Sequence, residues 1–109
     1  MKNTIDLHHL RALRSQIAYM TYLNRLEEDP GYREQLTQEV YRRWVRLCSR
    51  EWDPKQVEGY YCIRGNNRRL ARENGLPVQY DRLAVLAVSI FHLSHWRCNV
   101  TVANYLLAI

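Results

Sequence analysis

Apolar residues recur every three or four positions over most of this 109-residue chain, which is the spacing of one face of an α-helix. The first such stretch predicts a helix that Thr4 caps and that continues to Glu28, before a turn at Asp29-Pro30-Gly31. Its apolar positions are Leu10, Leu13, Ile17, Met20, Leu23 and Leu26. A second helix is expected over residues 32–50, with apolar positions at Tyr32, Leu36, Val40, Trp44 and Leu47.

Proline and glycine interrupt the helical spacing in the middle of the chain. Asp53-Pro54 is typical of a helix start, because aspartate caps helices and proline is tolerated at the first helical position. A short helix to about Tyr61 is therefore predicted. Gly59 weakens that helix, and an extended conformation of residues 60–63 remains the alternative.

A turn is predicted at Gly65-Asn66-Asn67, where Asn66 or Asn67 can cap a short helix over residues 68–74. Gly75 is placed to end that helix in the left-handed conformation, and a proline follows two residues later.

Residues 69–77 also resemble the tight turn of a helix-turn-helix motif, since a small alanine is followed four residues on by glycine. The recognition helix of such a motif would start near Val78 and would need a polar face, yet the chain becomes wholly apolar after Arg82. An ordinary helix that ends at Gly75 is the simpler interpretation.

The most apolar segment predicts a helix over residues 79–97. Nearly every face of residues 83–93 is apolar, which indicates a helix buried at the centre of the fold or against a partner. Val100-Thr101-Val102 is compatible with a strand, but a last short helix is the preferred interpretation. That helix would contain Ala103, Tyr105, Leu106 and Ile109.

These elements together predict an all-α fold, a compact single-domain bundle of five to six helices with short loops over residues 1–109. An apolar fraction of 47% is enough for a core, and four glycines and three prolines are too few for a loop-rich fold. No continuous apolar run marks a signal peptide, and residues 83–93 are too short to span a membrane. With three widely spaced cysteines, the expectation is a cytoplasmic protein with reduced thiols and no membrane partner.

A metal site and a catalytic site both find little support in the sequence. His92, His95 and Cys98 lie three residues apart, but no paired-cysteine motif accompanies them, so hydrogen-bonded histidines and a buried thiol are the expected roles. Ser89 and His92 are helical neighbours without an acid nearby to orient the histidine. We therefore expect no cofactor, no metal and no enzymatic activity.

Positive charge is concentrated in the second half of the chain. The net charge is +5, of which residues 1–63 carry +1 and residues 64–109 carry +4. Arginine presents a planar fork of donors that suits phosphate, and asparagine can reach base edges. The leading hypothesis is therefore binding of DNA or RNA through an arginine- and asparagine-rich turn and helix start. The candidate residues are Arg64, Asn66, Asn67, Arg68, Arg69 and Arg72, extended by Arg43 and Arg46.

Aromatic residues flank this basic stretch and support two interpretations. Tyr60, Tyr61, Tyr80 and Trp96 could stack bases of a single strand, but interfaces between proteins are also rich in tyrosine, tryptophan and arginine. The alternative function is a non-enzymatic adaptor, which would dock an acidic partner protein or form a homodimer through its basic patch and apolar C-terminal helices. Its candidate contact residues are Tyr60, Tyr61, Leu106 and Ile109.

Overall fold

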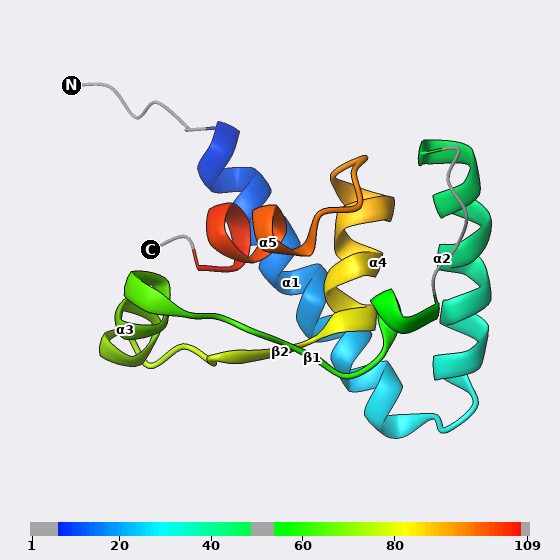
Figure 1. Cartoon of the computed structure of the whole chain (residues 1–109), viewed down its shortest axis with the longest axis horizontal. Coiled ribbons are helices and arrows are strands. Elements are labelled where there is room, and N and C mark those ends of the chain that lie inside the picture. Colours follow the sequence, from blue (N-terminus) through cyan, green and yellow to red (C-terminus); the bar gives the residue numbers. More distant parts are fainter. Residues whose placement is uncertain (1–6, 49–53, 108–109) are drawn as a thin grey trace.

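The helix α4, Arg82–His92, forms the centre of the fold and lies between α1, Leu7–Glu28, and α2, Tyr32–Cys48 (Figure 1). The computed structural model describes residues 7–48 and 54–107. Every residue of α4 from Leu83 to Ile90 is buried, as its uninterrupted apolar sequence predicts. The hydrophobic effect therefore holds this helix in place from all sides.

The helix α4 is shorter at both ends than the predicted helix over residues 79–97. It begins only at Arg82, because the Asp81 side chain accepts hydrogen bonds from the backbone N–H groups of Leu83 and Ala84 and so caps the first turn. It ends at His92, since Ser94 adopts a left-handed backbone conformation with φ of 59°. Residues 93–97 then form a loop.

The helix α2 buries the predicted stripe, whereas α1 buries Leu26 and partly buries Leu10 and Leu23 but leaves the rest of its predicted stripe exposed. Leu36, Val40 and Trp44 of α2 are in the core. In α1 the buried residues are Ala12, Ser15, Tyr19 and Leu26. The predicted apolar positions Leu13, Ile17 and Met20 are exposed by 41%, 67% and 50%. The face that α1 buries over residues 12–20 therefore differs from the predicted one, and it combines the small side chains of Ala12 and Ser15 with the ring of Tyr19.

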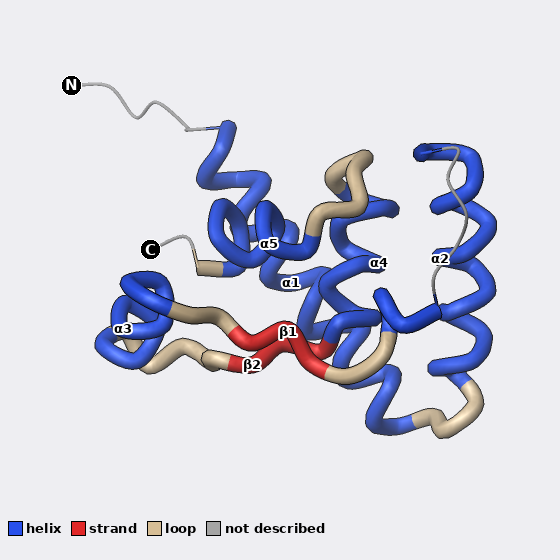
Figure 2. The backbone as a smooth tube through the Cα atoms, viewed as in Figure 1, coloured by secondary structure: helices blue, strands red, loops and turns tan. Residues whose placement is uncertain are grey.

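Residues 60–81 form an arm that projects from the helices. The strands β1, Tyr60–Cys62, and β2, Gln79–Asp81, pair antiparallel, with Tyr61 opposite Tyr80, and α3, Gly65–Glu73, connects them (Figure 2). The extended alternative is thus confirmed for residues 60–62. The predicted helix from Pro54 to about Tyr61 is wrong beyond the 3₁₀ turn η1, Pro54–Val57.

Gly75 ends α3 as the sequence predicts. Its φ is 69°, a left-handed conformation that glycine adopts at little cost. The backbone N–H of Gly75 donates to the carbonyl of Arg72, and that of Leu76 donates to the carbonyl of Ala71. This paired arrangement satisfies carbonyls that the helix end leaves open. The chain then continues into β2 and not into a second helix at Val78, so the helix-turn-helix resemblance is not realised.

The chain returns to the core in a last helical segment, which confirms a final helix and excludes the strand at residues 100–102. The helix α5, Cys98–Thr101, continues as a π-helical segment η2, Val102–Leu106, which packs against α1. Ile109 lies outside the described residues. The predicted all-α bundle is confirmed, with five α-helices and one small sheet in the described ranges. No helix in those ranges is long and apolar enough to cross a membrane.

Candidate nucleic-acid interface

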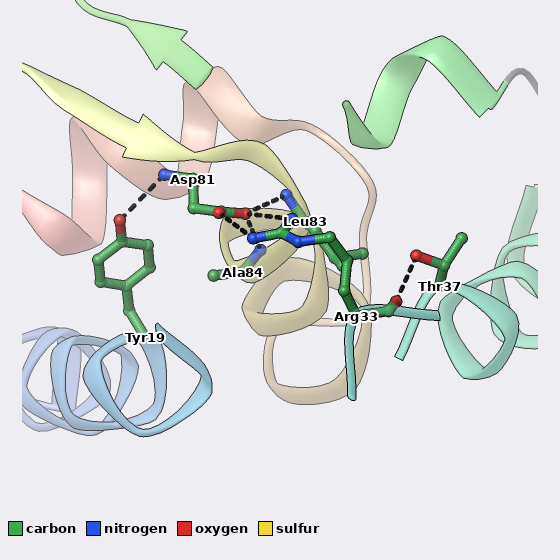
Figure 3. A network of polar contacts seen from close by, with 6 residues as sticks. All are labelled: Tyr19, Arg33, Thr37, Asp81, Leu83 and Ala84. Atoms are coloured by element: carbon green, nitrogen blue, oxygen red, sulfur yellow. Dashed lines mark hydrogen bonds and ion pairs between the residues drawn. The ribbon is translucent and has the colours of Figure 1, made fainter. Parts of the chain in front are cut away.

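Asp81 fixes the base of the arm to the helical core (Figure 3). Its carboxylate accepts a hydrogen bond from Arg33 of α2 at 2.8 Å, in addition to the two from the first turn of α4. This hydrogen bond raises the pKa of the Arg33 guanidinium. The backbone N–H of Asp81 donates to the hydroxyl of Tyr19 in α1 at 3.0 Å. One residue thus connects the last strand of the arm to three helices.

The helix α3 lies at the end of the arm and presents most of its surface to solvent. Only Ala71 of this helix is buried. The residues Arg64, Arg68 and Arg72 are four apart, so they form one stripe along the helix, and Arg69 lies beside it. All four arginines are exposed.

The charges on α3 are nearly free of internal pairing. In the part of the chain that the structure describes, Arg69 is the only one of the four arginines in an ion pair. Its Nε lies 3.8 Å from Oε1 of Glu73, and both side chains are exposed, so the pair contributes little. The helix therefore offers a concentrated positive surface to an anionic partner.

Asn66 and Asn67 lie inside the helix and do not cap it. The helix begins at Gly65, three residues earlier than predicted, and Arg64 occupies the N-cap position without a side-chain hydrogen bond. Both asparagine side chains are exposed beside the arginine stripe. Their predicted capping role is wrong, but they remain accessible to a ligand.

Arg43 and Arg46 do not extend this surface. They belong to α2, and α2 and α3 lie at opposite ends of the longest axis of the molecule, which measures 47 Å (Figure 1). The Arg43 guanidinium lies over the ring of Phe91, 5.9 Å from its centroid. The two arginines therefore border a separate shallow hollow on α2.

A groove connects the foot of α3 to the loop after α4. It consists of two adjacent hollows, of about 540 Å³ and about 310 Å³, which share Tyr61 and Arg82. The first hollow is lined by Tyr60, Tyr61, Cys62, Ile63, Arg64, Asn67, Arg82, Val102 and Ala103. The second is lined by Trp44, Tyr61, Arg82, Leu86, Trp96, Arg97, Cys98 and Asn99. We call these two hollows together the arm groove.

The arm groove is positively charged. Arg64, Arg82 and Arg97 line it, and none of its described lining residues is an aspartate or glutamate. The Nε of Arg82 donates to the backbone carbonyl of Tyr60 at 3.2 Å, which holds the guanidinium against β1. Its terminal nitrogens make no hydrogen bond within the described ranges, so they are available to an anion in the groove.

Aromatic rings form part of the groove wall. Tyr61 and Trp96 are half-buried in the groove, whereas Tyr60 is 61% exposed and points with Asp81 to the other face of the ribbon, where it also lines the hollow beside Arg33. Trp96 meets the buried Trp44 edge to face, with 6.1 Å between ring centroids. Tyr80, which the sequence also associated with the basic stretch, points away into the core against Tyr19, and burial raises its pKa to about 12.

Arg82 and Arg97 are the groove residues that sequence reasoning did not select. They are isolated in an apolar stretch, ten or more residues after the basic run that ends at Arg72. Only the return of the chain along β2 brings Arg82 beside β1. A signal was present in the aromatic residues that flank the basic run, since Tyr60, Tyr61 and Trp96 all line the same groove.

The proposed contact surface at the C-terminal helices is largely buried. Leu106 is only 5% exposed, because η2 packs it onto α1, so it cannot contact a partner as predicted. Tyr60 and Tyr61 lie in the arm groove. The apolar surface of α4 is likewise covered by the chain itself.

The residues His92, His95 and Cys98 do not come together as a cluster of metal ligands. No group of three metal-ligating side chains occurs in the described ranges. Nε2 of His92 lies 3.1 Å from the Tyr22 hydroxyl, and Nδ1 of His95 accepts a hydrogen bond from the backbone N–H of Arg97. Burial raises the pKa of Cys98 to about 11, so its thiol stays protonated at neutral pH.

Comparisons with known proteins give no further assignment for this site. No protein-family model, curated protein or solved structure matches the chain.

Proposed function

We propose that this protein binds nucleic acid, and that the arginines of α3 supply its main contacts to phosphate. The observation that carries the proposal is the position of α3, which projects from the core and exposes Arg64, Arg68, Arg69 and Arg72 with one weak internal ion pair. Guanidinium groups bind phosphate oxygens through paired, charge-assisted hydrogen bonds. Such a surface is suited to a polyanion.

Binding of this kind depends strongly on salt concentration. Each phosphate that an arginine neutralises releases condensed counterions, so the logarithm of the binding constant falls with the logarithm of salt concentration. Four contacts correspond to a slope of about −3 to −4. The proposal therefore predicts both the sign and the approximate steepness of the salt dependence.

The test measures fluorescence anisotropy of labelled oligonucleotides, from about 50 to 200 mM salt. The variant Arg68→Ala/Arg69→Ala removes two exposed charges from α3. The control Arg42→Ala/Arg46→Ala removes two exposed charges from α2, at the far end of the molecule. We expect the α3 variant to bind about tenfold more weakly at low salt, with a slope shallower by roughly 1.5, and the control to change little.

Two results would contradict the proposal. If both variants lose affinity equally, net charge and not α3 determines binding. If no oligonucleotide binds even at the lowest salt concentration, the protein does not bind nucleic acid. An acidic protein partner for the same helix then becomes the leading hypothesis, and capture of acidic proteins by α3 would be the next experiment.

A further inference from the structure

We infer that the ligand of this protein is single-stranded nucleic acid, and that its bases are held in the arm groove beside α3. This inference rests on the proposed function and adds the class of nucleic acid and a second binding surface. It is carried by the charge, the aromatic residues and the size of the groove.

The charge of the groove continues that of α3. Arg64 belongs to both surfaces, because it precedes the first residue of α3 and also lines the first hollow. Arg82 lies where the two hollows meet, and Arg97 lines the second. A phosphodiester backbone that follows the groove from α3 would therefore meet three guanidinium groups in succession, without a carboxylate from the described lining residues to repel it.

The aromatic residues favour a single strand over a duplex. Tyr61 and Trp96 present half-buried rings inside the groove, whereas the exposed Tyr60, which precedes Tyr61 in β1 and pairs with Asp81, points to the other face of the ribbon. An unpaired base can stack on such rings, whereas the bases of a duplex are already stacked on one another. The aromatic wall therefore adds affinity only for a strand whose bases are free.

The size and floor of the groove fit an unstacked base. Hollows of about 540 and 310 Å³ fall in the range of small-ligand sites, which is roughly 300–1,000 Å³. The buried side chains of Ile63 and Val102 form an apolar floor in the first hollow, and Leu86 does so in the second. Each hollow can accept the apolar face of one base, while a duplex is too wide to enter.

The experiment compares three labelled probes of equal length: a 12-nucleotide oligo(dT), a 12-nucleotide oligo(U) and a 12-base-pair DNA duplex. The groove variant is Tyr61→Ala, which removes the half-buried ring that lines both hollows. Tyr61→Phe keeps the ring and is its matched control, and the helical circular dichroism of both variants shows whether they fold. We expect the wild-type protein to prefer the single strands, Tyr61→Ala to weaken them about tenfold, and Tyr61→Phe to leave them unchanged.

A chemical footprint tests the same site without changing the aromatic wall. Cys62 is exposed and lines the first hollow. In a Cys48→Ser background, a bound single strand should slow the reaction of Cys62 with a thiol reagent several-fold. A duplex at the same degree of saturation should leave Cys62 accessible, because it contacts α3 alone.

The outcomes separate this inference from the proposed function. If Arg68→Ala/Arg69→Ala weakens every probe while Tyr61→Ala weakens none, α3 binds nucleic acid but the groove holds no base, and the inference is overturned. A duplex that binds as tightly as the single strands, or that protects Cys62 equally, overturns it as well. If no probe binds, the proposed function itself fails.

Discussion

Asp81 is expected to be the polar residue on which the attachment of the arm most depends. It is 6% exposed and serves two roles with one carboxylate. Oδ1 accepts from the backbone N–H groups of Leu83 and Ala84, at 3.0 and 3.3 Å, and Oδ2 accepts from Arg33 at 2.8 Å. The variant Asp81→Ala removes both roles and leaves the buried N–H groups without a side-chain acceptor.

The expected loss in the free energy of unfolding is about 2 kcal/mol. Loss of an N-cap residue typically costs about 1 kcal/mol. The ion pair adds up to about 1 kcal/mol, and not more, because the Arg33 side chain is 50% exposed and water screens it. The contact between the Tyr19 hydroxyl and the backbone of residue 81 survives the substitution, so it does not enter the sum.

Urea unfolding, followed by the helical signal in circular dichroism, measures this loss. Asp81→Ala should lower the midpoint without a change in slope, and should lower Tm by roughly 8 °C. Asp81→Asn is the matched control, because asparagine caps helices as well as aspartate does but lacks the charge, so it should lose about half as much. A value for Asp81→Ala within about 0.5 kcal/mol of wild type would refute the capping argument. Equal losses in both variants would show that charge alone matters.

Three further predictions concern titration and packing. The pKa of Tyr80 in the folded protein is about 12, above the ordinary 10, so between these two pH values the hydroxyl ionises only in the unfolded chain. The free energy of unfolding should therefore decrease progressively from pH 10 to 12. Tyr80→Phe should reduce this decrease, and an unchanged alkaline profile would contradict the prediction. Burial, and to a lesser extent the charge of Arg97, lowers the pKa of His95, so the unfolded chain binds a proton more readily than the folded one. The free energy of unfolding should therefore decrease as the pH falls below about 6.5. His95→Gln should reduce this decrease, measured by urea unfolding at pH 7.5 and 5.5. Ile17→Ser in α1 should change the free energy of unfolding by under about 0.5 kcal/mol, whereas Leu36→Ala in the buried face of α2 should cost about 3 kcal/mol. A loss at Ile17 as large as that at Leu36 would refute the exposed position of Ile17 on α1.

The sequence predicts helices well where one apolar face is unambiguous. The stripe of α2 allows one buried orientation, and the continuous apolar run of α4 indicates burial on every side, and the structure has both. Residues 7–28 allow two. Burial of Ala12 and Ser15 in place of Leu13 and Ile17 depends on how α4 and η2 pack against α1, which the spacing of apolar residues within α1 does not contain.

The short strands are hard to predict from the sequence for a different reason. The strand residues Tyr60–Cys62 have no alternating pattern of their own, and their pairing partner lies 17 or more residues further along the chain. A two-stranded ribbon is marginal in isolation, so its stability here comes from the core at its base, where Tyr80 and Asp81 are buried. Local sequence therefore indicates an extended conformation without deciding between it and a helix.

The candidate site likewise has one part that the sequence predicts and one part that only the tertiary fold creates. The basic run from Arg64 to Arg72 is contiguous, so composition alone locates it on the chain, and the structure places it on one exposed helix. The arm groove depends on two single arginines, Arg82 and Arg97, which contribute to it only because β2 returns beside β1 and the loop after α4 folds back toward Tyr61. A charge run can attract any polyanion, but selection between a duplex and a single strand needs a wall of rings at a fixed distance from that charge. If Tyr61→Ala removes the preference for single strands and leaves duplex binding intact, that selection originates in the tertiary fold, and the basic run contributes affinity alone.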